Sequence, residues 1–118
     1  MKQMRKKILS VILSTGIMMS VLPINVLAGS SSTNVGSYRL YVSCSTKSST
    51  HQVTVLSGSN ATYPTGSATV RYTLNGQSKT AHPTGTSYKT YWAASYSCPG
   101  SIYSAVTNGY GGTVTAYP

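Results

Sequence analysis

The chain has 118 residues, with nine Lys and Arg, two His, two Cys and no Asp or Glu. Glycosidase-type catalysis needs paired carboxyl groups and is excluded, while calcium and magnesium sites need carboxylate oxygens and are nearly excluded. The length allows one domain. The positive charge leaves two interpretations open, a solvated surface or attraction to anionic polymers.

The first 28 residues are predicted to be a secretory signal peptide. Four Lys and Arg within residues 1–7 precede an apolar run at 8–22, and a small-residue cleavage site ends at Ala28. The run is shorter than the roughly 20 residues that a membrane-spanning helix needs. We therefore expect cleavage after Ala28, no stable membrane span, and a secreted, extracellular product. The lysine-rich leader is typical of Gram-positive bacteria.

Residues 29–36 are rich in Ser, Asn and Gly and are predicted to be a flexible lead-in to a single domain at 37–118. From Tyr38 to Cys44 apolar and polar residues alternate. This period of two predicts a strand with Leu40 on its inner face.

A polar loop at 45–50 and a second strand are predicted next. The alternation at 68–74 predicts a third strand, and an Asn-Gly dipeptide follows it directly. This dipeptide favours a type I′ turn, because both central residues need positive φ. Pairing across the turn sets Tyr72 opposite Lys79 and predicts a short edge strand.

A long fifth strand is predicted at 88–98, where the parity places Cys98 on the same face as Trp92. The first strand places Cys44 on its apolar face. Export favours oxidation, so we predict one disulfide between Cys44 and Cys98 across the core.

Residues 102–107, the Asn108-Gly109 dipeptide and residues 113–117 predict a closing hairpin with a glycine-rich turn. About seven short strands with regularly spaced turns, and no helical periodicity after the leader, define the fold class. We predict an all-β fold, a small antiparallel β-sandwich or a small barrel with one disulfide.

Aromatic and basic residues alternate on the predicted exterior. Tyr41 and Tyr91 have outward parity beside Arg39 and Lys89, and Arg71 points outward from the third strand. Such rings stack on sugars or bases while the cations hold phosphates, so these five residues are the predicted binding residues. The alternative is that Tyr only replaces the absent Phe in strands.

Catalytic residues, metal ligands and cofactors are not expected. A serine paired with His51 or His82 would form a dyad, but 51 opens a strand and 82 precedes a proline. We interpret His51 as a rim residue and His82 as a turn residue. Two distant His residues do not complete a tetrahedral metal site with the cysteines.

Residues 49–56, Ser-Thr-His-Gln-Val-Thr-Val-Leu, resemble the Thr-His plus Thr-Val strand of lactococcin-type bacteriocins. The resemblance is confined to this segment, where Thr50 and His51 fall on matching positions. It implies a small exported cationic β-sandwich whose family role is to block the use of a cell-wall precursor at the septum.

The leading hypothesis is a secreted, cationic, bacteriocin-like antimicrobial protein without enzymatic activity. It would act as a monomer that binds an anionic cell-wall polymer or a lipid-linked precursor. A nucleic-acid partner is not expected for an exported protein with so little basic charge. The alternative is a non-enzymatic surface, adhesive or carbohydrate-binding β-module.

Overall fold

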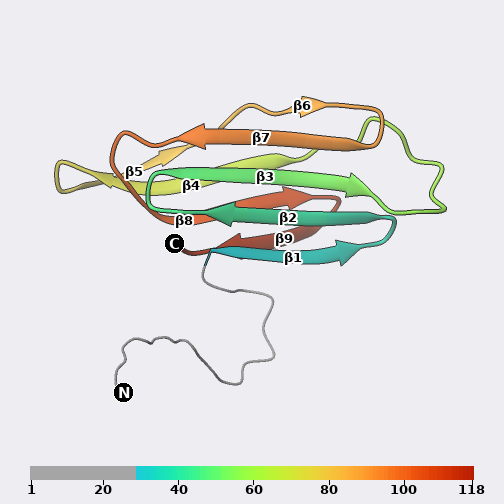
Figure 1. The fold of residues 1–118 in the computed structure, drawn as a ribbon, viewed down its shortest axis with the longest axis horizontal. Coiled ribbons are helices and arrows are strands. Elements are labelled where there is room, and N and C mark those ends of the chain that lie inside the picture. Colours follow the sequence, from blue (N-terminus) through green and yellow to red (C-terminus); the bar gives the residue numbers. More distant parts are fainter. Residues whose placement is uncertain (1–28) are drawn as a thin grey trace, which may run out of the picture.

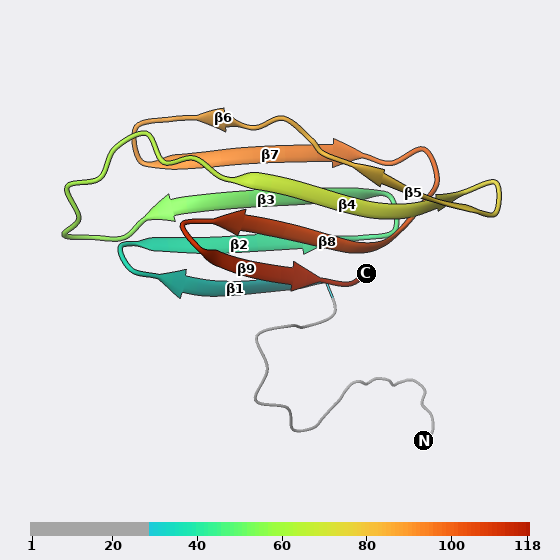
Figure 2. The same ribbon diagram turned by 180° about the vertical axis from the view of Figure 1, so that it is seen from behind.

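Residues 29–118, which the computed structural model describes, form two antiparallel β-sheets that face each other (Figure 1). The strands are β1 (Ser30–Val35), β2 (Tyr38–Cys44), β3 (Ser48–Val55), β4 (Ser67–Leu74), β5 (Gln77–Ala81), β6 (Thr86–Ser87), β7 (Tyr91–Ser97), β8 (Ser101–Gly109) and β9 (Gly112–Ala116). One sheet has the order β1-β2-β3-β7-β6 and the other β5-β4-β8-β9; Figures 1 and 2 show them from opposite sides. The predicted all-β class is confirmed, and the predicted signal peptide at 1–28 lies outside the described residues.

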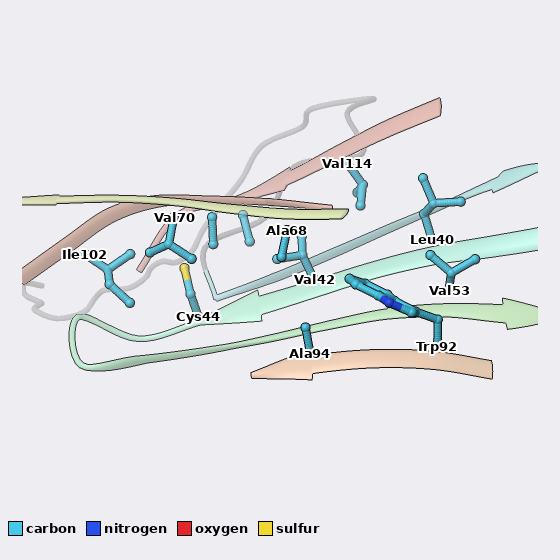
Figure 3. Packing of buried hydrophobic residues seen from close by; sticks show 12 residues of the cluster. Leu40, Val42, Cys44, Val53, Ala68, Val70, Trp92, Ala94, Ile102 and Val114 are labelled. Atoms are coloured by element: carbon cyan, nitrogen blue, oxygen red, sulfur yellow. The ribbon is translucent and has the colours of Figure 1, made fainter. Parts of the chain in front are cut away.

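The core lies between the sheets because alternate residues of each strand point inward (Figure 3). In the five-stranded sheet, Leu40, Val53 and Trp92 are neighbours in one row across β2, β3 and β7. The four-stranded sheet contributes Val70 and Val114, among others, to the same buried cluster. Each fully buried aliphatic side chain of this kind stabilises the fold by about 1.5–3 kcal/mol.

The hairpin between β4 and β5 forms as the sequence predicted. Asn75 and Gly76 have φ values of 53° and 78°, which the two-residue turn requires. Tyr72 pairs with Lys79 in the register of this hairpin. Strand β5 is an edge strand with exposed polar residues.

The closing hairpin forms where it was predicted, but its turn lies two residues beyond the Asn108-Gly109 dipeptide. Gly109 pairs with Gly112, so the turn consists of Tyr110 and Gly111, with φ values of 51° and 84°. Tyr110 is held there by its ring, which stacks on Tyr38 at a centroid distance of 3.7 Å. Its hydroxyl also accepts a hydrogen bond of 2.9 Å from the backbone N–H of Thr65. Because of these tertiary contacts, the turn forms at Tyr110 and Gly111 and not at Asn108 and Gly109. The contacts cannot be predicted from the local sequence.

The predicted flexible lead-in at 29–36 is wrong, because Ser30–Val35 forms β1 and pairs with β2 along its whole length. A two-residue turn joins the strands, with Gly36 at φ 56° in the first central position, as is common in tight hairpins. The strand was missed because it has little apolar alternation: its buried inner residue is Ser31.

The predicted disulfide is wrong as well, because Cys44 and Cys98 are not bonded. Cys44 pairs with Ser49 of β3, and Ser49 pairs with Tyr96 of β7. Strand β3 thus separates the two cysteine-bearing segments, and two strand spacings of about 4.8 Å exceed the Cα–Cα limit of about 6.8 Å for a disulfide. In Figure 3 the thiol of Cys44 points instead toward the opposite sheet.

Candidate binding face

The outward side chains of β1, β2, β3, β7 and β6 make up one surface, which we call the outer face. Its members alternate with the core residues of these strands and belong mainly to Ser, Thr, Asn, Gln and Tyr. Residues of the outer face are Ser32, Asn34, Arg39, Tyr41, Ser43, Thr50, Gln52, Thr54, Thr86, Tyr91, Ala93 and Ser95. Hydroxyl and amide groups of this kind donate and accept hydrogen bonds without carrying charge.

Four of the five predicted binding residues lie on or beside the outer face. Arg39 pairs with Thr54, and Thr54 pairs with Tyr91, so these side chains stand in one row across three strands. Tyr41 stands one row further along β2. Lys89 is exposed in the turn that precedes β7.

Arg71, the fifth predicted binding residue, lies apart. It is exposed on β4 and pairs with Thr80 and Ser104 within the four-stranded sheet. The odd positions of β2 and β4 both point outward, but the two sheets face opposite sides. Alternation alone gives inward or outward orientation and does not say on which of two sheets a strand lies.

Arg39 borders a hollow of about 560 Å³ lined by Ser32, Thr33, Asn34 and Leu56. Its Nη2 atom donates a hydrogen bond of 3.3 Å to Oγ of Ser32. A guanidinium group has five N–H donors, and the chain has no carboxylate side chain to compete for them. This end of the outer face therefore offers donors in the geometry that suits phosphate or carboxylate.

The basic residues of the described chain do not form one dense patch. Lys47 donates its Nζ proton to the carbonyl of Gly100 at 2.8 Å, at the hairpin between β2 and β3. Lys79 lies with Arg71 on the four-stranded sheet. Arg39 and Lys89 are thus the cations available to a ligand on the outer face.

Tyr88 is a residue of this region that the sequence placed only within a long strand. The strand begins at Tyr91 instead, and the backbone N–H of Tyr88 donates to the carbonyl of Tyr91 at 2.7 Å. The two rings stack at 4.6 Å, and both are exposed. The alternation of Thr84, Thr86 and Tyr88 is the signal that could have placed these residues together on one side of β6.

His51 is fully buried, which contradicts the prediction of a rim residue. Its Nδ1 atom is 3.0 Å from Oγ1 of Thr107, and its Nε2 atom is 2.9 Å from Oγ of Ser49. The Thr107 hydroxyl donates its proton to the carbonyl of Tyr41 and must accept one from Nδ1. Ser49 then donates to Nε2, which fixes a single neutral tautomer.

This buried chain of hydrogen bonds links the two sheets, because Thr107 belongs to β8 while its partners belong to β2 and β3. Burial lowers the pKa of His51 to about 4, although a hydrogen bond to the backbone of Val106 acts in the opposite direction. The histidine is therefore neutral at pH 7. At this point of the core, the His51 side chain takes the place of an apolar one, and both of its ring nitrogens have hydrogen-bond partners.

The Ser49 hydroxyl, the His51 ring and the Thr107 hydroxyl have the spacing of a nucleophile, a general base and a group that orients the base. However, Ser49 is only 3% exposed, and the sheets would have to separate before a substrate carbonyl reached its oxygen. His82, in contrast, is exposed and lies 3.4 Å from Oγ1 of Thr69, with no second catalytic partner among its described contacts. The geometry around both histidines favours structural roles.

Among residues 29–118, no three His, Cys, Asp or Glu side chains gather where they could hold a metal ion. No helix in this part of the chain is long and apolar enough to cross a membrane.

Comparison with protein-family models, with curated proteins and with solved structures gave no match. The resemblance of residues 49–56 to lactococcin-type bacteriocins therefore stays a prediction. The structure adds that His51, within this segment, is a buried core residue and that Thr50 is exposed on the outer face.

Proposed function

We propose that the chain is a secreted, non-enzymatic, bacteriocin-like antimicrobial protein that docks its outer face on an anionic component of a target cell envelope. The observation that carries the proposal is the row of Arg39, Thr54 and Tyr91, with Lys89 beside it, on a sheet face that the described chain leaves open. The protein would act as a monomer. Secretion rests on the leader predicted at 1–28.

The chemistry of this row suits a wall polymer or a lipid-linked precursor that carries both sugar and phosphate. The guanidinium group of Arg39 binds a phosphate through paired donors, while the exposed ring of Tyr91 stacks on a sugar. Because the chain has no acidic side chain, no side-chain carboxylate neutralises these cations before binding.

Two double variants with the same change in charge test the proposal. Arg39→Gln with Lys89→Gln removes two cations beside the outer face, and Arg71→Gln with Lys79→Gln removes two from the other sheet. Each cation near an anionic surface contributes about 1 kcal/mol. Because the first variant loses two such contributions, we expect it to bind isolated Gram-positive cell walls about 30-fold more weakly in dilute buffer and to lose inhibition of bacterial lawns.

The second variant is the control and should bind almost as tightly as the unmodified protein. Equal losses in the two variants would show that net charge acts without a preferred face. No retention of the unmodified protein on cell walls at low salt, together with no inhibition of growth, would contradict the proposal itself.

A carbohydrate-binding β-module is the second candidate, and the uncharged hydroxyl and amide groups around Tyr41 favour it. Tyr41 stands in one row with Ser32 and Gln52, so its ring is flanked by hydrogen-bonding groups. Binding of this kind depends on stacking and hydrogen bonds, and salt screens it little. Retention that persists in 0.5 M salt and falls with Tyr41→Ala would favour the module over electrostatic docking.

A further inference from the structure

A hollow of about 310 Å³ lies on the outer face over β7 and is separate from the row that contains Arg39. Seven residues line it: Thr50, Thr84, Thr86, Tyr88, Ala93, Ala94 and Ser95. They come from β3, from β6 and its flanking residues, and from β7. The volume is at the lower end of the range for ligand sites.

The strand register explains the hollow. Ala93 of β7 stands between Gln52 of β3 and Thr86 of β6, and Ser95 pairs with Thr50. At Ala93 and Ser95, the outer side of β7 thus carries small side chains, while the paired residues of the neighbouring strands are larger. The result is a trough along β7 with methyl and hydroxyl groups on its floor.

One wall of the trough depends on Gly85. A Cβ atom at this position would run into the indole ring of Trp92, so only glycine lets the chain pass this close to the core. The residues on either side, Thr84 and Thr86, then lie along the edge of β7. Both residues border the trough.

Tyr88 borders the trough and is held in place before any ligand arrives. The residue is 46% exposed, and its ring stacks on Tyr91 at 4.6 Å with an interplanar angle of 23°. Tyr91 is not among the lining residues, so it supports the ring from outside the trough. A side chain fixed in this way loses little conformational entropy when a ligand binds.

We propose that the trough is a subsite for a neutral pyranose unit of a glycan chain. Its lining combines hydroxyl groups, which bond to sugar hydroxyls, with a fixed aromatic ring and the methyl group of Ala93, which contact the apolar C–H face of a pyranose. None of the seven lining residues is charged. A phosphate or carboxylate bound here would have no cation among the lining residues to pair with, whereas a neutral sugar does not need one.

This subsite rests on the proposed docking of the outer face and adds a ligand class to it. Arg39 stands in the row that ends at Tyr91, and Tyr91 in turn stacks on Tyr88 at the trough. A polymer of alternating sugar and phosphate would thus meet a cation and a sugar subsite on the same surface.

The experiment is a titration of the purified protein with neutral trisaccharides in 0.5 M NaCl, where electrostatic docking is screened. Chitotriose, cellotriose and maltotriose are the probes, and backbone amide NMR shifts are the readout. We expect at least one probe to shift the amides of Thr84, Tyr88 and Ala93 with a dissociation constant on the order of 1 mM. No shift at these residues with any probe would overturn the proposal.

Two variants locate the site. Tyr88→Ala removes the aromatic wall, and Ala93→Leu fills the trough from its floor without removing a contact of the core. Each should weaken binding at least tenfold. Tyr117→Ala is the matched control, because Tyr117 is equally exposed, at 48%, but lies beyond the end of β9, and it should leave binding unchanged.

Binding that is the same in all three variants would show that the sugar lies elsewhere and would overturn the subsite. That result would leave the docking proposal standing as long as the double variant at Arg39 and Lys89 still loses retention on cell walls. The amide spectrum of each variant without sugar reports whether it is folded, and Tyr88→Phe provides a second, milder change that keeps the ring.

Discussion

At the scale of single residues, His51 matters most for how this protein responds to acid. In the folded protein the pKa of His51 is lowered to about 4 by burial, whereas an unfolded histidine has a pKa of about 6.5. The unfolded state therefore takes up the proton first as the pH falls. The chain has no Asp or Glu, so the titrations that usually dominate acid unfolding are missing.

We expect the free energy of unfolding to be highest above pH 6.5 and to fall by about 3 kcal/mol as the pH is lowered to 4. Urea unfolding at pH 7.5, 5.5 and 4 measures it. His82→Gln changes an exposed histidine and should keep this loss, whereas His51→Gln should reduce it. A stability that stays constant from pH 7.5 to 4 in the unmodified protein would contradict the role given to His51.

The sequence predicts on which side of its strand the His51 side chain lies, but it does not predict that the residue is fully buried. The residue lies two positions before Val53, so alternation puts both side chains on the same side of the strand. The predicted loop at 45–50 shortened that strand, while β3 in fact begins at Ser48. Thr107, the partner that satisfies Nδ1, comes from the other sheet, and no local pattern links residues so far apart.

At the scale of elements, β1 is the strand that the sequence did not reveal. Its residues are mostly Ser, Thr and Asn, which are typical of loops, yet they pair with β2 throughout. Two contacts hold its ends to the rest of the fold. The backbone N–H of Gly29 donates to the carbonyl of Tyr117 at 2.5 Å, and Gly112 leaves room for Val35 because a Cβ there would meet that side chain.

Hydrogen exchange distinguishes a paired β1 from a flexible lead-in. We expect the amides of β1 that face β2 to exchange about 100-fold more slowly than in an unstructured peptide, because they are hydrogen-bonded in the sheet. Amides of the same strand that point away from β2 provide the internal control and should exchange faster. Rapid exchange of every amide from Ser30 to Val35 would show that the strand does not form in solution.

Two of the turns differ in what determines them: one depends on its local sequence and the other on a contact with the opposite sheet. The Asn-Gly turn between β4 and β5 was predictable, because positive φ at both residues is a property of those residue types. The turn at Tyr110 was not, because a tyrosine takes positive φ only where something else holds it. Here the stack on Tyr38 comes from the other sheet.

At the scale of the whole molecule, the order of the strands determines which distant residues meet. Alternation predicted correctly that Cys44 is on an inner face, and it gave the strands their approximate limits. It did not give the sheet order β1-β2-β3-β7-β6, in which β3 lies between the strands that lead to the two cysteines. Without the sheet order, alternation groups Arg71 with the other predicted binding residues, although it lies on the other sheet.

The two thiols therefore provide a direct test of the sheet order. Alkylation with iodoacetamide in guanidinium chloride, without a reductant, should add two groups to the purified protein, as measured by mass spectrometry. In the folded protein Cys98, which is half-buried, should react before Cys44, because Cys44 is buried and burial raises the pKa of its thiol.

Cys98→Ser keeps an acceptor for the N–H of Gly100, which bonds to the sulfur at 3.3 Å. It should lower the free energy of unfolding by less than about 1 kcal/mol, whereas losing a disulfide across so long a loop would cost about 4 kcal/mol. A protein without alkylated cysteines, and a loss of that larger size, would mean that the two segments are neighbours and that the strand order is different.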